Sequence, residues 1–159
     1  MTDAPSRAST RNSRVIRASP EALYAAFVEP TLLAQWLPPA EMTGRIHEFD
    51  ARVGGGYRMS LYYPETERTM RGKTNDGEDM VRVRFTELRP PERIVESVRF
   101  ESDDPAFGAE MTLTVTFDRV AGGTAVTLAF ENLPPGLRSE DNEAGAELSL
   151  AQLACLMEA

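Results

Sequence analysis

The chain has 159 residues with a formal net charge of −8, one cysteine and one histidine. A length of this order favours a single domain that buries enough surface to fold without a disulfide or a structural metal. The acidic balance argues against a nucleic-acid-binding surface, which needs concentrated positive charge. The single cysteine excludes an internal disulfide framework and fits a cytoplasmic protein, and no segment approaches the ~20 apolar residues of a membrane-spanning helix.

The first residues of the chain are polar, and a strand is expected to follow them. Residues 1–10 are rich in Ser, Thr and Ala, a composition that predicts a disordered N-terminal tail. A single domain is then expected to span residues 11–159. Its first strand is expected over residues 13–19, where the sequence SRVIRAS ends just before a proline.

Two short helices are predicted after this strand. Ser19 is a suitable N-cap for the first, and Pro20 suits the first helical position. Pro30 is expected to end this helix, because its ring disfavours helical geometry in the residue before it. Thr31 is expected to cap the second helix, which Pro38-Pro39 then ends.

Alternating apolar and polar residues predict strands over most of the remaining chain. A polar segment over residues 64–79 reads as a long connection between two of them, and Gly122-Gly123 predicts a hairpin turn. Strands in hairpin order, two short helices near the start and one long helix at the end predict an α+β fold with an antiparallel sheet. The strands are expected over residues 42–51, 53–63, 80–88, 93–102, 110–119 and 124–132.

The closing helix, expected over residues 142–158, is apolar on nearly every side. The side that carries Leu148, Ala151 and Cys155 needs a neighbour other than the sheet, either the two short helices or a second copy of the chain in a homodimer. The opposite face is expected to pack over the concave face of the sheet, and it carries Ala146, Leu150, Leu153, Ala154 and Met157.

Five segments in order carry a family resemblance: TRNSRVIRASPEALYAAFVEPTLLAQWLPP, FDARVGGGYRMSL, FTELRPPERIVES, GGTAVTLAFENLPPG and NEAGAELSLAQLACLME. Together they resemble the START-like superfamily, and within it the bacterial homologues of the C-terminal domain of the heat-shock-protein-90 ATPase activator. The resemblance covers residues 11–158 and implies a helix-grip fold, in which a curved antiparallel sheet wraps around a long C-terminal helix and leaves a cavity. The chain departs from the family at Ala146, because many relatives have tryptophan there, and the missing ring leaves a gap or extra room.

No group of residues predicts catalytic chemistry, a metal site or a bound cofactor. His47 alternates with Arg45 in a predicted strand, which indicates the exposed face. Cys155 is expected to be a small buried apolar residue rather than a nucleophile. The sequence VGGGYR precedes a strand, so it lacks the loop-to-helix geometry that binds phosphate.

The residues expected to face inward are mostly methionines and aromatic rings. Methionine adapts to an irregular ligand, although the same pattern also describes plain core. Arg84 and Tyr24 are candidates for a polar anchor. The candidates for lining a ligand cavity are Trp36, Tyr57, Met59, Leu61, Phe85, Phe100, Met111, Leu113, Phe130, Leu150, Leu153 and Met157.

Three functions fit these observations, in order of preference. The first is binding of a small hydrophobic molecule, lipid-like, aromatic or polyketide-like, in a cavity between the sheet and the last helix. The second is an aromatase/cyclase-type enzyme that acts through the shape of that cavity, which an inward-facing Arg, Tyr or Glu would support. The third, implied by the family resemblance, is interaction with a chaperone whose ATPase activity the protein modulates.

Overall fold

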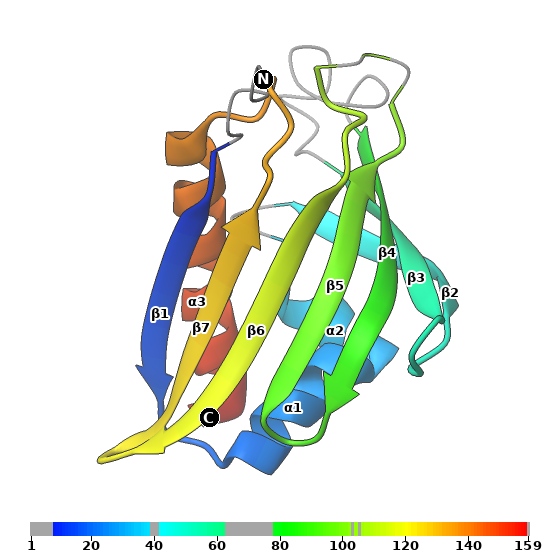
Figure 1. Ribbon diagram of the computed structural model, residues 1–159. Coiled ribbons are helices and arrows are strands. Elements are labelled where there is room, and N and C mark those ends of the chain that lie inside the picture. Colours follow the sequence, from blue (N-terminus) through cyan, green and yellow to red (C-terminus); the bar gives the residue numbers. More distant parts are fainter. Residues whose placement is uncertain (1–7, 39–41, 63–77, 103, 105, 159) are drawn as a thin grey trace, which may run out of the picture.

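The structure is a computed structural model, and it describes residues 8–38, 42–62, 78–102, 104 and 106–158 (Figure 1). Within them, seven strands form one antiparallel sheet in the order β1-β7-β6-β5-β4-β3-β2. In chain order the elements are β1 (Thr10–Ile16), α1 (Pro20–Val28), α2 (Pro30–Trp36), β2 (Thr43–Phe49), β3 (Gly56–Tyr62), β4 (Glu78–Arg89), β5 (Arg93–Phe100), β6 (Met111–Val120), β7 (Gly123–Glu131) and α3 (Ser139–Glu158).

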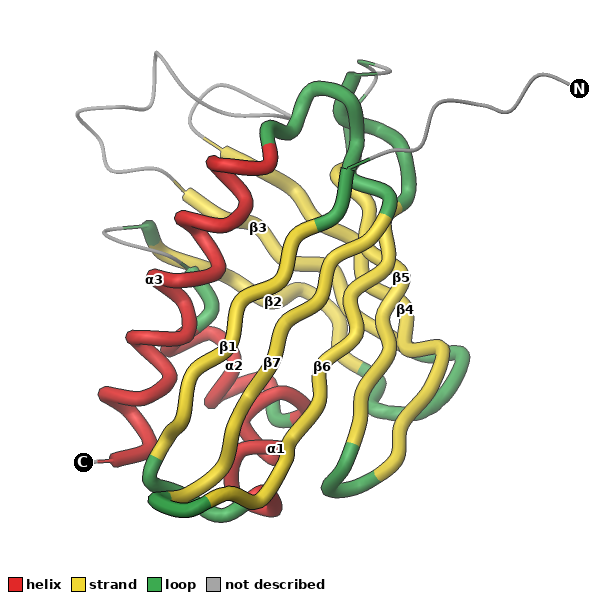
Figure 2. Tube along the Cα trace, turned by 60° about the vertical axis from the view of Figure 1, so that its left-hand side comes forward, coloured by secondary structure: helices red, strands yellow, loops and turns green. Residues whose placement is uncertain are grey.

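The arrangement of these elements confirms the predicted α+β helix-grip fold. The sheet curves, and α3 runs along it beside β1 (Figure 2). The first strand of the chain pairs with the last, β7, which places both beside α3. The short helices α1 and α2 lie at the end of the sheet where α3 finishes (Figure 1). No helix in the described ranges is long and apolar enough to cross a membrane.

The predicted strands are all present, with small differences at their ends. β1 begins at Thr10 rather than at residue 13, and β4 begins at Glu78 rather than at residue 80. Most of the predicted connection over residues 64–79, and most of the predicted N-terminal tail, lie outside the described residues.

The junction between α1 and α2 corrects one prediction. Ser19 caps α1 as expected, since its Oγ accepts a hydrogen bond of 3.1 Å from the backbone N–H of Ala22. Pro30, however, begins α2 instead of only ending α1, and Glu29 lies at the end of one helix and the start of the next. The prediction that Thr31 caps α2 was wrong, because proline fits the first helical position, where an N–H would lack a helical partner in any case.

Aromatic contacts join the two short helices to the sheet. The ring of Phe27 lies 4.7 Å from that of Trp36 and 5.4 Å from that of Phe117, edge to face in both pairs. Trp36 is fully buried, and its indole N–H donates a hydrogen bond of 3.0 Å to the carbonyl oxygen of Ala26. The core therefore continues from the concave face of the sheet into the space between α1 and α2.

α3 divides into the two faces that the sequence predicts. Four of the five residues expected to face the sheet are buried, namely Ala146, Leu150, Leu153 and Ala154, and Met157 is half-buried. On the other side Leu148 is 45% exposed. Cys155 is also exposed, so the expectation that it is buried was wrong, because it lies on the side of the helix that faces away from the sheet.

Polar side chains of α3 fix it to the end of α2. Ser149 donates a hydrogen bond of 2.7 Å to the carbonyl oxygen of Leu37. The Gln152 amide donates to the carbonyl oxygens of Trp36 and Pro38, at 2.6 and 2.7 Å. Since the last carbonyl groups of a helix lack partners within it, α3 supplies the donors that α2 needs.

Candidate functional site

A carboxyl group lies in the middle of the apolar concave face. β5 is the central strand of the sheet, and its alternation turns Ile94, Glu96 and Val98 inward. Glu96 is only 3% exposed. In the strand register its immediate neighbours are Phe85 on β4 and Leu113 on β6, so the carboxyl group is surrounded by hydrocarbon and aromatic side chains.

Burial controls the charge of this group. Loss of solvation raises the pKa of Glu96 to about 8, because an apolar environment disfavours the charged form. The side chain is therefore mainly protonated at neutral pH. It makes no hydrogen bond or ion pair with any residue in the described part of the chain, although buried polar groups in proteins nearly always have a partner.

Tyr57, on β3, provides a second polar group on this face. It is 6% exposed. Burial, followed by the negative charge of Glu96, raises the pKa of Tyr57 well above its usual value, so the two groups lie close enough to interact electrostatically and the phenol stays neutral. Its ring stacks on Phe49 at 5.2 Å and lies 6.0 Å from that of Phe85. Among the described residues its hydroxyl has no hydrogen-bond partner.

The pair can donate two hydrogen bonds into an apolar environment. A protonated carboxylic acid and a phenol each carry one O–H group, and a carboxylic acid held neutral by its surroundings acts as a hydrogen-bond donor at neutral pH.

Asp79, 2% exposed and in register with Leu61, is a further buried carboxyl group on the concave face. In the described part of the chain no three possible metal ligands lie together.

Sequence reasoning missed Glu96, although the signal was present. In RIVESVRF, a period of two places Glu96 between Ile94 and Val98 on the face that also holds Phe100. A charged residue at an inward position of a central strand breaks the apolar pattern, and such a break indicates either a buried polar contact or a functional group.

The residues predicted to line the cavity belong to the core of the described structure or pack against it. Leu61, Phe130 and Met157 are half-buried, and the others are buried. Trp36 lies between α1 and α2, and its N–H donates to the carbonyl oxygen of Ala26, so it is not free to bind a ligand. The buried members are Trp36, Tyr57, Met59, Phe85, Phe100, Met111, Leu113, Leu150 and Leu153.

The two predicted polar anchors lie away from Glu96. Arg84 is exposed, and it lies on the convex face because its neighbours Val83 and Phe85 turn inward. Tyr24 is buried on α1, where its ring lies 5.8 Å from that of Phe117. Burial raises the pKa of Tyr24. Tyr57 and Glu96, rather than Arg84 and Tyr24, provide the polar groups at the centre of the sheet.

His47 and Ser60 form a hydrogen bond, but the Ser60 hydroxyl is too deeply buried to meet a substrate. His47 is exposed, as its alternation with Arg45 predicts, and its Nε2 lies 2.7 Å from the Oγ of Ser60. Ser60 is fully buried, and its hydroxyl also donates to the sulfur of Met80 at 3.5 Å. A covered hydroxyl of this kind cannot attack a bound molecule, so this pair is structural.

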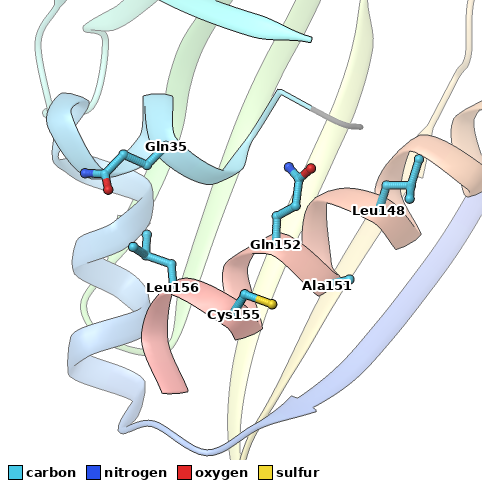
Figure 3. Close-up of a pocket in the computed structure, with 6 residues that line it drawn as sticks. All are labelled: Gln35, Leu148, Ala151, Gln152, Cys155 and Leu156. Carbon is cyan, nitrogen blue, oxygen red and sulfur yellow. The ribbon is translucent and has the colours of Figure 1, made fainter. Parts of the chain in front are cut away.

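A shallow groove lies on the outer side of α3, away from the sheet (Figure 3). Its volume is about 510 Å³, and it opens broadly to solvent. It lies on the side of α3 that was predicted to need a neighbour other than the sheet, and it is separate from the concave face. Gln35 of α2 lines it together with Leu148, Ala151, Gln152, Cys155 and Leu156 of α3.

Comparison with solved structures finds the same fold in other bacterial proteins. A protein of Chromobacterium violaceum superposes with a TM-score of 0.83 and 34% identity, over 95% of this chain and 97% of that one. The AHSA1 protein of Silicibacter pomeroyi gives a TM-score of 0.77 at 22% identity, over 95% and 98% of the two chains. A protein of Arthrobacter aurescens gives 0.78 at 14% identity, over 94% and 86%, so these last two relatives support the fold alone.

Sequence comparison agrees with the structural relatives. No curated protein gives a significant match. A family model described as "Activator of Hsp90 ATPase homolog 1-like protein" matches residues 17–158, which is almost the whole chain and includes β3, β5 and α3. The chain therefore belongs to the activator of Hsp90 ATPase homolog 1-like protein family.

Proposed function

We propose that this protein binds a small, largely apolar molecule, lipid-like, aromatic or polyketide-like, between the concave face of the sheet and α3. The observation that carries the proposal is Glu96, a buried carboxyl group without a hydrogen-bond partner in the described structure. Burying such a group costs free energy. A ligand that forms hydrogen bonds with it offsets that cost.

Apolar side chains elsewhere on the concave face supply the remaining contacts. Leu61, Val81 and Phe130 pack against the core from β3, β4 and β7, yet each stays half-buried. Leu61 and Val81 share the inward face with the buried Met59. Ligand pockets combine mainly apolar walls with a few placed polar groups, and this face offers both.

A thermal-shift screen tests the proposal. The probes are apolar molecules of graded size with one, two or three rings, together with fatty acids. A probe at a hundred times its dissociation constant stabilises the folded state by about 2.7 kcal/mol, which for a chain of this size raises Tm by about 5–10 °C. If no probe raises Tm, and native mass spectrometry shows no bound probe, the proposed function is wrong.

A second candidate function is catalytic, and Glu96 favours it. An intramolecular aldol cyclisation removes a proton from the carbon beside one carbonyl group, and it delivers a proton to the oxygen of the carbonyl that is attacked. Glu96 is in the protonated form that delivers such a proton, water accepts the proton that leaves the carbon, and that proton then returns to the Glu96 carboxylate. Incubation with a flexible aromatic polyketone tests this function: cyclised product should appear with the wild-type protein and disappear with Glu96→Gln.

A further inference from the structure

We propose that Tyr57 and Glu96 together bind a carbonyl oxygen, so that the ligand is an uncharged, apolar ketone or quinone. This inference rests on the proposed function and names the class of molecule that the site accepts. Both groups lie on the concave face, at 6% and 3% exposure. In the described structure both lack a hydrogen-bond partner.

The hydrogen-bonding chemistry of the pair favours a carbonyl group over other polar groups. The Tyr57 phenol and the protonated Glu96 acid each present an O–H donor, and a carbonyl oxygen accepts two hydrogen bonds through its two lone pairs. An amine ligand would need Glu96 to be ionised, which its apolar surroundings oppose. A carboxylate ligand would place a second charge in the same apolar surroundings without a cation beside it.

The surroundings of the pair fit the rest of such a molecule. Glu96 lies in a cross-strand row with Phe85 on one side and Leu113, then Phe130, on the other. Phe130 is half-buried, so it leaves aromatic surface for the rings of a ketone, whereas Phe85 is fully covered by its neighbours. The ring of Tyr57 is held by Phe49 and Phe85, so its hydroxyl is positioned before the ligand arrives, which lowers the entropy cost of binding.

Matched pairs of probes isolate the contribution of the carbonyl group. Acetophenone is compared with ethylbenzene, 2-acetonaphthone with 2-ethylnaphthalene, and fluorenone with fluorene, and each pair shares its ring skeleton. Two hydrogen bonds formed away from water predict that the ketone binds the wild-type protein about tenfold more tightly than its hydrocarbon partner. The carbonyl stretch of the bound ketone, measured by infrared difference spectroscopy, should lie below its position in a hydrocarbon solvent.

Four variants assign the effect. Glu96→Leu leaves the Tyr57 hydroxyl as the single donor, so it should reduce the preference for the ketone about threefold and move the carbonyl stretch toward its position in hydrocarbon. Tyr57→Phe removes a single hydroxyl and should reduce the preference about threefold. Glu96→Gln retains an N–H donor and should retain part of the preference. Glu131→Gln, at an exposed position at the end of β7, is the control for loss of a carboxylate and should change nothing.

The outcomes separate this inference from the proposed function. If ketones and hydrocarbons bind the wild-type protein equally, the protein binds apolar molecules but the assignment of Tyr57 and Glu96 is wrong. The same conclusion follows if the preference stays at its wild-type value in both Tyr57→Phe and Glu96→Leu. Should Glu96→Leu fail to fold, Tyr57→Phe and the infrared shift decide the question alone. If no probe binds the wild-type protein, the proposed function fails, and this inference fails with it.

Discussion

At the scale of single residues, Glu96 is the least expected feature of the structure. Apolar side chains at the other inward positions of β5 contribute to the core, whereas this carboxyl group opposes burial. The chain tolerates it by keeping the group protonated, as its pKa of about 8 indicates. Its presence in the centre of the sheet reduces stability, and residues that reduce stability are frequent at functional sites.

Glu96 should make the stability of the protein depend on pH. Its pKa is about 8 in the folded state, against an ordinary value of 4.5, so between these values the folded state holds a proton that the unfolded state releases. Stability should therefore fall as pH rises from 4.5 to about 8 and change no further above it, by a total on the order of 5 kcal/mol. Below pH 4.5 both states are protonated, and the effect disappears.

Urea denaturation at pH 5, 7 and 9 measures this dependence. Glu96→Gln removes the titrating group but keeps its shape, so the difference in unfolding free energy between variant and wild type should grow in favour of the variant as pH rises. Because every other titrating group is common to both proteins, the difference isolates Glu96. A difference that stays constant across the three pH values would show that the carboxyl group is not held protonated.

At the scale of elements, the contact between α3 and α2 depends on side-chain hydrogen bonds as well as on apolar packing. Ser149 and Gln152 donate to the last carbonyl groups of the α2 segment. These contacts fix the distance of α3 from the short helices, and α3 also covers the inward face. The position of α3 over the candidate site is therefore set partly by these polar contacts with the α2 segment.

Removing the Gln152 amide should weaken this contact. Gln152→Ala leaves the carbonyl groups of Trp36 and Pro38 without their donor, and it should lower the unfolding free energy by about 1–3 kcal/mol. Gln35→Ala is the matched control, since Gln35 is exposed and its amide donates within its own helix, to the carbonyl oxygen of Thr31. It should cost less than about 0.5 kcal/mol. Equal losses in urea denaturation would contradict this role of Gln152.

Substitution of two glycines by alanine should change the stability of the protein in opposite directions. Gly145 lies inside α3, and a methyl group there would meet open space, so Gly145→Ala should stabilise the protein by about 0.5–1 kcal/mol. Gly123 has a φ of +143°, and its methyl group would meet the backbone of Ile16. Gly123→Ala should therefore destabilise the protein, and thermal unfolding of the two variants measures both signs.

Local sequence signals predicted the secondary-structure elements well where capping residues or the spacing of apolar residues indicated them. The Ser19 cap, the alternating strands and the two faces of α3 followed from them. Pro30 was misassigned because one proline can both end a helix and begin the next. Cys155 was misassigned because an apolar circumference does not show which side of a helix lacks a neighbour.

The candidate site was harder to predict than the fold, because it depends on contacts between strands. Tyr57 and its partners Phe49 and Phe85 come from three different strands whose register the sequence does not give. Glu96 acquires its raised pKa from that same packing. Arg84 was chosen as an anchor by residue type, and the strand alternation placed it on the opposite face.

At the scale of the whole molecule, α3 and the curved sheet enclose the inward face, and Ala146 offers a way to test how much space they leave. Ala146 lies in the first half of α3 and is buried. Ala146→Trp should fill part of the ligand space and abolish the Tm shift caused by apolar probes, while the variant still folds. A loss of about 1–3 kcal/mol of stability, measured by denaturation, would instead show that the position is already fully packed.

The central claim is that the concave face, rather than the outer groove of α3, receives the ligand. Isotope-edited nuclear Overhauser spectroscopy of the protein with 2-acetonaphthone tests it most directly. The account predicts contacts from the bound ketone to the rings of Tyr57 and Phe85 and to the methyl groups of Leu113. Contacts to Leu148 and Leu156 of the outer groove, with none to the concave face, would contradict it.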